Sequence, residues 1–263
     1  MKLSLCGVFL MSLMSARAVA QSPFDGTWKG DVDDSQTSTR PRYNFLLQEG
    51  IYHCTTCDPP VEVKADGRDH KITGDPCFDS VSVGVLDALT TSETYKKNGT
   101  TMRTTKVTVS PDGNTATREW TESCNVNRDV VAGKDLLTRV QHGPPGSHAM
   151  SGSWRLTKRM SRSENALIAT LKLEGDTFSF SDPAGQGYAA KLDGTEAPIK
   201  GSLSNTLVSV KQIDQQTIQE TDTRDGKVVE VIRFTVSADG KTLTISMENK
   251  ANGSVSQFIA RKQ

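Results

Sequence analysis

Short runs of alternating apolar and polar residues, separated by turn formers, make up most of the chain after its first twenty residues. In the second half these runs cover residues 153–156, 167–173, 177–180, 188–192, 207–213, 217–223, 227–236, 241–247 and 254–260. Alternation with a period of two is typical of half-buried strands. Glycines in the separators, as in Arg224-Asp225-Gly226 and Ala238-Asp239-Gly240, suit the positive φ of tight hairpins. The pattern predicts eight or nine short strands joined by hairpins in this half.

The two halves of the chain repeat one another. The segment Gly26-Thr27-Trp28-Lys29 returns as Gly152-Ser153-Trp154-Arg155, and Thr108-Val109-Ser110-Pro111-Asp112-Gly113 returns as Thr235-Val236-Ser237-Ala238-Asp239-Gly240. The offset stays between 125 and 127 residues throughout, which indicates two copies of one unit. Residues 143–148 are rich in glycine and proline and have the composition of a linker. We therefore expect a first repeat at 21–142, a linker at 143–151 and a second repeat at 152–263.

A sheet of eight or nine hairpin-linked strands exposes two long edges unless it curls onto itself. Closing the sheet into a barrel removes these edges. We therefore expect an all-β protein made of two tandem up-and-down antiparallel β-barrels, with eight or nine strands in each. A sandwich of two sheets is the alternative architecture.

The first twenty residues have the pattern of an export signal. Lys2 supplies a positive start, residues 3–13 an apolar run, and Ala18-Val19-Ala20 the small residues that a signal peptidase accepts. Cleavage after Ala20 leaves a mature protein that is secreted or periplasmic. A membrane anchor is the alternative, but it needs about 20 apolar residues, and serines and Arg17 interrupt this run.

Four cysteines follow the export segment, namely Cys54, Cys57, Cys77 and Cys124. In an oxidising compartment an even number predicts two disulfides. Three connectivities are possible, and the local one is preferred: Asp58-Pro59-Pro60 bends the chain directly after Cys57, so the sulfurs of Cys54 and Cys57 can approach, which leaves Cys77 for Cys124. A zinc site formed by His53, Cys54, Cys57 and Cys77, and a redox-active Cys-x-x-Cys, are the alternatives.

Charge and motif content narrow the function classes. Thirty-one Lys and Arg balance 31 Asp and Glu, so the field that attracts nucleic acid or an anionic membrane is missing, and we expect neither as a partner of the mature protein. No Gly-x-Ser-x-Gly elbow, phosphate-binding glycine loop or His-Glu-x-x-His motif is present. We predict a protein that is not an enzyme and uses no cofactor or metal. An enzyme whose residues assemble only in three dimensions is the alternative, and the sequence does not indicate any protein partner.

The Gly-x-Trp opening of each repeat, followed by hairpin-linked strands and a closing strand with Arg139 or Arg261, resembles the lipocalin and calycin barrels. The Asp-Gly-Lys-Val-Val and Val-Ser-Ala-Asp-Gly-Lys-Thr-Leu-Thr stretches are similar to small secreted bacterial proteins with lipocalin-like repeats and no assigned activity. The resemblance implies that the first-strand tryptophan closes the barrel floor under a basic residue of the last strand. On this basis Trp28 is expected to pair with Arg139, and Trp154 with Arg261, as cation–π contacts. It also implies a barrel that binds a small, mostly apolar molecule.

Differences between the repeats suggest where a ligand would bind. Leu243, Ile245 and Met247 alternate on one strand face of the second repeat, whereas the first repeat has Ala116, Arg118 and Trp120 there. Thr105 likewise stands where the second repeat has Ile232. If these faces point inward, the first barrel is the roomier and more polar, and Arg118 could grip an anionic ligand while Trp120 covers its apolar body. If the register is shifted by one residue, Arg118 faces solvent instead.

Two classes of function follow from these patterns. One is a protein that binds a small apolar or amphipathic anionic molecule in its first barrel, through Arg118, Trp120 and Thr105. The other is a structural or interaction protein with two filled barrels. An interior cavity above about 300 Å³ in the first half favours binding, because ligand pockets begin near that size.

Overall fold

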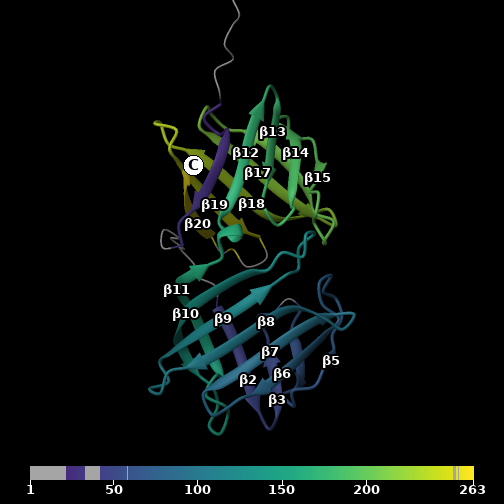
Figure 1. The fold of residues 1–263 in the computed structure, drawn as a ribbon, viewed down its shortest axis with the longest axis vertical. Coiled ribbons are helices and arrows are strands. Elements are labelled where there is room, and N and C mark those ends of the chain that lie inside the picture. The colour runs from purple at the N-terminus through teal and green to yellow at the C-terminus, as the bar shows by residue number, and fades with distance from the viewer. Residues whose placement is uncertain (1–21, 33–41, 58, 251–252, 254) are drawn as a thin grey trace, which may run out of the picture.

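The computed structural model describes residues 22–32, 42–57, 59–250, 253 and 255–263, and Figure 1 shows two barrel-like sheets stacked along the long axis. The predicted export segment lies outside the described residues. Each sheet has ten antiparallel strands, slightly more than the eight or nine expected. The 3₁₀ turn η1 (Glu164–Ala166) is the one helical element among the described residues. Within these ranges no helix is long and apolar enough to cross a membrane.

Barrel one consists of strands β2 to β11. Its strands neighbour one another in the order β4 (Val61–Lys64), β3 (Ile51–Cys54), β2 (Arg42–Gln48), β11 (Gly152–Arg162), β10 (Val131–His142), β9 (Thr115–Glu122), β8 (Thr100–Val109), β7 (Thr90–Lys97), β6 (Ser80–Val85) and β5 (His70–Lys71). Beyond the end of β4, the Gly67 amide donates a hydrogen bond to the Val83 carbonyl of β6. The sheet is therefore nearly closed.

Barrel two consists of β1 together with β12 to β20. Its order is β14 (Gly187–Lys191), β13 (Thr177–Ser181), β12 (Ile168–Glu174), β1 (Gly26–Gly30), β20 (Val255–Lys262), β19 (Thr242–Asn249), β18 (Lys227–Val236), β17 (Thr217–Arg224), β16 (Leu207–Gln212) and β15 (Ala197–Pro198). A bridge between Gly187 and Lys200 joins β14 to the chain just after β15. This second sheet is nearly closed as well.

The two repeats exchange their first strands. Strand β1 pairs with β12 and β20 of the second repeat, whereas β11 pairs with β10 and β2 of the first. The barrels are therefore not the contiguous segments 21–142 and 152–263. The predicted linker at 143–151 joins β10 to β11 within barrel one and contributes the fully buried Met150 to its core. The connections between barrels are residues 31–41, only partly described, and 163–167.

A local pairing explains why β11 stays with the first repeat. It follows β10 after a short connection and pairs along almost its whole length, so the entropy cost of closing this hairpin is small. Barrel two then needs a first strand, and β1 supplies it with the same Gly-x-Trp pattern. The repeat in the sequence does not reveal this exchange, because the two strands are nearly interchangeable in composition.

Each exchanged strand places a fully buried tryptophan in the core of the barrel that it completes. Trp154 is fully buried in barrel one, and its Nε1 donates to the Met150 carbonyl at 2.8 Å. Trp28 is fully buried in barrel two, and its Nε1 donates to the Phe24 carbonyl at 2.9 Å. These equivalent contacts show that both strands occupy the same position in their respective barrels.

The exchange also changes the cation–π pairs. The Arg139 guanidinium carbon lies 3.9 Å from the ring centroid of Trp154, and the Lys262 ammonium lies 5.0 Å from that of Trp28. The expected pairs of Trp28 with Arg139 and of Trp154 with Arg261 are therefore wrong. Arg261 is exposed, since it precedes Lys262 in β20 and successive strand residues face opposite sides. In both barrels, however, a cation from the strand that pairs with the exchanged strand lies over the tryptophan: Arg139 of β10 in barrel one and Lys262 of β20 in barrel two.

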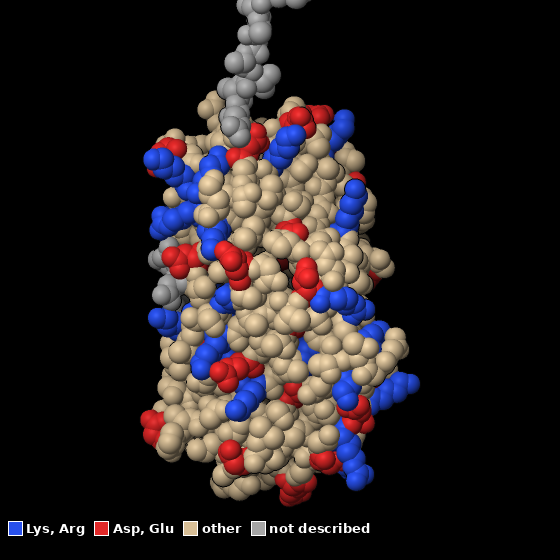
Figure 2. Space-filling view, viewed as in Figure 1, with Lys and Arg blue, Asp and Glu red and all other residues tan. Residues whose placement is uncertain are grey.

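Charges of both signs are mixed on one face of the molecule (Figure 2). Figure 2 shows basic and acidic side chains interspersed on the visible face of both barrels, without a continuous patch of either sign. This distribution agrees with the balanced composition of the chain.

Candidate functional site

All four described cysteines form disulfides, in the predicted pairs. Cys54 is bonded to Cys57 beside the end of β3, and Cys77 to Cys124 across 47 residues. Zinc needs thiolate ligands, so the bonded sulfurs do not fit the zinc alternative. The bonded Cys54–Cys57 pair is also the oxidised form of a redox-active Cys-x-x-Cys. Two disulfides indicate an oxidising environment.

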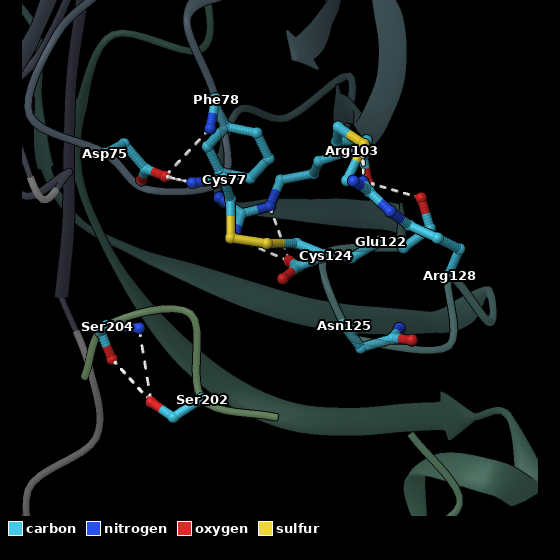
Figure 3. The surroundings of a disulfide bond; sticks show 12 residues. Asp75, Cys77, Phe78, Arg103, Glu122, Cys124, Asn125, Arg128, Ser202 and Ser204 are labelled. Atoms are coloured by element: carbon cyan, nitrogen blue, oxygen red, sulfur yellow. Dashed lines mark hydrogen bonds and ion pairs between the residues drawn. A yellow bond between two sulfur atoms is a disulfide. The ribbon is translucent and has the colours of Figure 1, made fainter. Parts of the chain in front are cut away.

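The longer disulfide joins two loops at one end of barrel one (Figure 3). Asp75 accepts hydrogen bonds from the backbone amides of Cys77 and Phe78, at 2.6 and 3.2 Å, which fixes the first loop. Cys124 lies in the second loop, residues 123–130, which touches barrel two. There the Asn127 amide donates to the Pro183 carbonyl at 3.0 Å. The disulfide thus anchors the contact between the barrels.

A cavity of about 230 Å³ lies inside barrel one, at this disulfide-bearing end. Its wall combines aromatic rings, small polar groups and four charged side chains. It is lined by Tyr43, Phe45, Cys54, Thr56, Cys57, Pro59, Val61, Ile72, Asp75, Phe78, Glu93, Tyr95, Arg103, Thr105, Val107 and Arg118. Arg118 and Thr105 of the expected site are in this wall, and Trp120 is not.

Arg118 faces the interior of barrel one. Alternation along β9 places it on the same side as the buried Ala116. Its Nη1 donates to the Tyr43 hydroxyl at 3.0 Å, and its guanidinium carbon lies 5.0 Å from the centroid of that ring. The register of β9 is therefore the one in which Arg118 points into the barrel, and not the shifted one in which it would face solvent.

The carboxylate nearest to Arg118 is shared with a second arginine. Asp135 on β10 lies 3.7 Å from Arg118 but only 2.6 Å from the Nη2 of Arg162, and its side chain is 3% exposed. It also accepts a hydrogen bond from Nε1 of Trp120 at 3.1 Å. Two guanidinium groups thus share one carboxylate, and the looser contact belongs to Arg118.

Trp120 packs on Arg162 rather than on Arg118. The Arg162 guanidinium carbon lies 5.1 Å from the Trp120 centroid. The indole also packs against Gly133 on β10, where a Cβ atom would come within 2.6 Å of the ring and 2.7 Å of the Arg162 guanidinium. Trp120 is therefore not placed to cover the apolar body of a ligand in the cavity, as the sequence suggested, but contacts Asp135 and Arg162.

A second charged group in the cavity, Glu93, is absent from the site expected from the sequence. It is 7% exposed, and it accepts hydrogen bonds from the hydroxyls of Tyr52 at 2.8 Å and Tyr95 at 3.0 Å. Burial and the negative charge of Glu93 raise the pKa of both tyrosines, so they stay protonated and donate. The signal in the sequence is the alternation of Thr91, Glu93 and Tyr95 on one face of β7.

Arg103, in contrast, already has a close ion pair. Its Nε and Nη2 both lie 2.7 Å from Oε2 of Glu122, and its guanidinium carbon is 4.6 Å from the Phe78 centroid (Figure 3). Its charge is therefore balanced by Glu122 within the protein, and its role at the cavity is mainly to form part of the wall.

Barrel two differs at the equivalent positions. Ile245, which corresponds to Arg118, packs against an apolar core that includes Phe178 and Phe234. Glu220, which corresponds to Glu93, accepts a hydrogen bond from the Tyr188 hydroxyl and is 4% exposed. The position that lines the cavity of barrel one with Arg118 is thus filled by apolar packing in barrel two.

Three carboxyl groups come together in barrel two, on β17 and β18. Asp222 is the cross-strand neighbour of Glu230, and its Oδ1 is buried without a hydrogen-bond partner. Burial raises the pKa of Glu220, Asp222 and Glu230, and the charge of Asp222 raises that of the two glutamates further. The pKa values of these carboxyl groups are higher in the folded than in the unfolded state. Their contribution to the free energy of unfolding is therefore fully present below about pH 4, and it is lost as pH rises through the folded-state pKa values.

We expect Asp222→Asn to stabilise barrel two at pH 7, by about 1 kcal/mol, because it removes a buried charge with an unpaired oxygen. The gain should fade towards pH 4, where the wild-type carboxyl is protonated. Urea denaturation of both proteins at pH 4 and pH 7 measures the effect. Glu196→Gln, at an exposed position, is the control and should change little. A gain that grows towards pH 4 would contradict the assignment.

No protein-family model matches this chain, and a comparison with curated proteins found no match either.

Proposed function

We propose that the protein is a lipocalin-like binding protein, secreted or periplasmic, that holds a small amphipathic anion in barrel one. The observation that carries this proposal is the cavity in barrel one with Arg118 in its wall. The guanidinium keeps donors for a ligand, because its carboxylate neighbour Asp135 is bound more closely by Arg162. A carboxylate or phosphate group is the natural complement of such an arginine.

The size of the cavity narrows the ligand class. At about 230 Å³ it does not reach the roughly 300 Å³ expected above for a binding protein, so its size alone does not favour binding, and any ligand must be smaller than a drug-sized one. Aromatic rings from Tyr43, Phe45 and Phe78 form much of its wall. The proposed ligand is therefore a small molecule with one apolar or aromatic body, rather than a long lipid.

The compartment is inferred from two independent features. The first twenty residues have the pattern of an export signal, and the two disulfides are typical of proteins outside the reducing cytosol. Both features support export of the mature chain.

A structural or interaction protein is the second candidate. It is favoured by the apolar packing around Ile245 in barrel two, and by the internal contacts that Arg118 makes with Tyr43 and Asp135. In that case the cavity would be a packing gap that holds only water.

The substitution Arg118→Met distinguishes the two. We expect it to abolish the binding of phenylacetate, a small aromatic carboxylate, as measured by isothermal titration calorimetry. Stability should be unchanged or higher, because Asp135 keeps Arg162 as its partner and a partly buried charge is removed. Unchanged phenylacetate binding would contradict the proposal, as would no binding by the wild-type protein.

The converse change, Ile245→Arg, is the matched control in barrel two. It places an unpaired charge in an apolar core, so we expect a loss of several kcal/mol in the free energy of unfolding. The contrast between the two variants tests whether the repeats have different interiors.

A further inference from the structure

We infer that the ligand of barrel one is a small zwitterion, in which Glu93 binds an ammonium group and Arg118 binds a carboxylate. This inference rests on the proposed binding function and assigns a second charge to its ligand. A free amino acid with an aromatic or apolar side chain has the required chemistry.

The first step is that Glu93 is a buried carboxylate without a counter-cation. Its partners are two neutral hydroxyls, of Tyr52 and Tyr95. Within the described residues no basic side chain forms an ion pair with it, whereas Arg103 pairs with Glu122, and Arg162 with Asp135. Buried charges in proteins are normally paired, because desolvation of an isolated ion is costly. A ligand cation would supply the missing partner.

The second step is that Glu93 has room to accept a further donor. Each oxygen of a carboxylate accepts about two hydrogen bonds, and each Glu93 oxygen here receives one from a tyrosine. Glu93 also lines the cavity, so an ammonium group in the cavity can reach it. The tyrosine hydroxyls hold the carboxylate in place for such a contact.

The third step is that Glu93 and Arg118 share one small space. Glu93 on β7 faces Thr105 on β8, and the next inward residue of β8, Val107, faces Arg118 on β9. Both charges act on Tyr52 and Tyr95, whose pKa values Glu93 raises and Arg118 lowers. Two opposite charges in one cavity of about 230 Å³ fit the two ends of a compact zwitterion.

The fourth step is that the rest of the wall suits an apolar or aromatic body. Tyr43, Phe45, Phe78 and Tyr95 contribute rings, and Phe78 lies 5.1 Å from Tyr95 between their centroids. Aromatic faces also stabilise a nearby cation. Barrel two lacks this combination, because Ile245 replaces Arg118 there and Glu220 lies beside a second acid, Asp222.

Three ligands that share one aromatic ring test the inference on the unmodified protein. Phenylacetate carries only a carboxylate, phenethylamine only an ammonium group, and free phenylalanine carries both. We expect phenylalanine to bind at least about tenfold more tightly than either of the others, as measured by calorimetry at pH 7. If phenylacetate binds as tightly as phenylalanine, this inference is wrong while the proposed function stands. If none of the three binds, the proposed function fails as well.

Matched variants then assign each charge to its residue. Glu93→Gln keeps the shape and should remove the advantage of phenylalanine over phenylacetate, whereas Arg118→Met should remove its advantage over phenethylamine. Glu220→Gln, the same change in barrel two, should leave all three affinities unchanged. Circular dichroism confirms that each variant is folded. A folded Glu93→Gln protein that keeps the full preference for phenylalanine would overturn the role of Glu93.

Discussion

Replacing Trp28 by alanine is expected to destabilise barrel two and to leave barrel one intact. Trp28 belongs by sequence to the first repeat, but it is fully buried in the core of the second barrel. Removing a buried tryptophan costs about 3–5 kcal/mol, which is a large fraction of the stability of one domain.

Hydrogen exchange followed by mass spectrometry localises the effect. In Trp28→Ala we expect faster exchange in β12 to β20 and unchanged exchange in β2 to β10. Trp154→Ala is the matched variant and should give the reverse pattern, because Trp154 is buried in barrel one. Faster exchange in β2 to β10 of Trp28→Ala would show that the repeats fold as contiguous units and would contradict the strand exchange.

The second large effect is expected from the loss of the long disulfide. In the chain-entropy model a bond that closes a loop of 47 residues contributes about 4 kcal/mol. The double variant Cys77→Ser with Cys124→Ser should therefore lower the stability of barrel one by about that amount. It also frees the loop at 123–130, whose Asn127 contacts barrel two.

The other disulfide provides the control for this measurement. Cys54 and Cys57 are only three residues apart, so their bond closes a much shorter loop and replacing both by serine should cost about half as much or less. Urea denaturation of the two double variants, followed by circular dichroism, compares them directly. If both double variants lost the same free energy of unfolding, the long disulfide would not stabilise barrel one through loop entropy.

Much of the fold could be predicted because its signals are local. Alternation of apolar and polar residues and glycine-bearing turns were enough to predict antiparallel barrels, and the bend after Cys57 gave the disulfide pairs. The exchange of β1 and β11 could not be predicted in the same way. Their Gly-x-Trp patterns are equivalent, so only the pairing of β1 with β12 and β20 reveals which barrel each one completes.

The candidate site was predicted in part, for a similar reason. Comparison of the repeats singled out Arg118, because Ile245 stands in its place in an apolar strand face, but it left open whether Arg118 points inward or to solvent, and only the strand register decides this. The partners of Arg118 come from other strands, such as Tyr43 on β2 and Asp135 on β10, and no sequence spacing relates them. Glu93 was missed because glutamate occurs at this position in both repeats, so the comparison showed no difference there.

Native mass spectrometry of the protein purified from its own host tests the central claim most directly, namely that barrel one holds a small molecule through Arg118. For the wild-type protein we predict a population carrying one additional small mass, which gentle activation releases. The Arg118→Met protein, purified in the same way, should be free of it, and Ser92→Ala, on the other face of β7, should retain it. Spectra without any additional mass for the wild-type protein, or with the same additional mass for Arg118→Met, would contradict the claim.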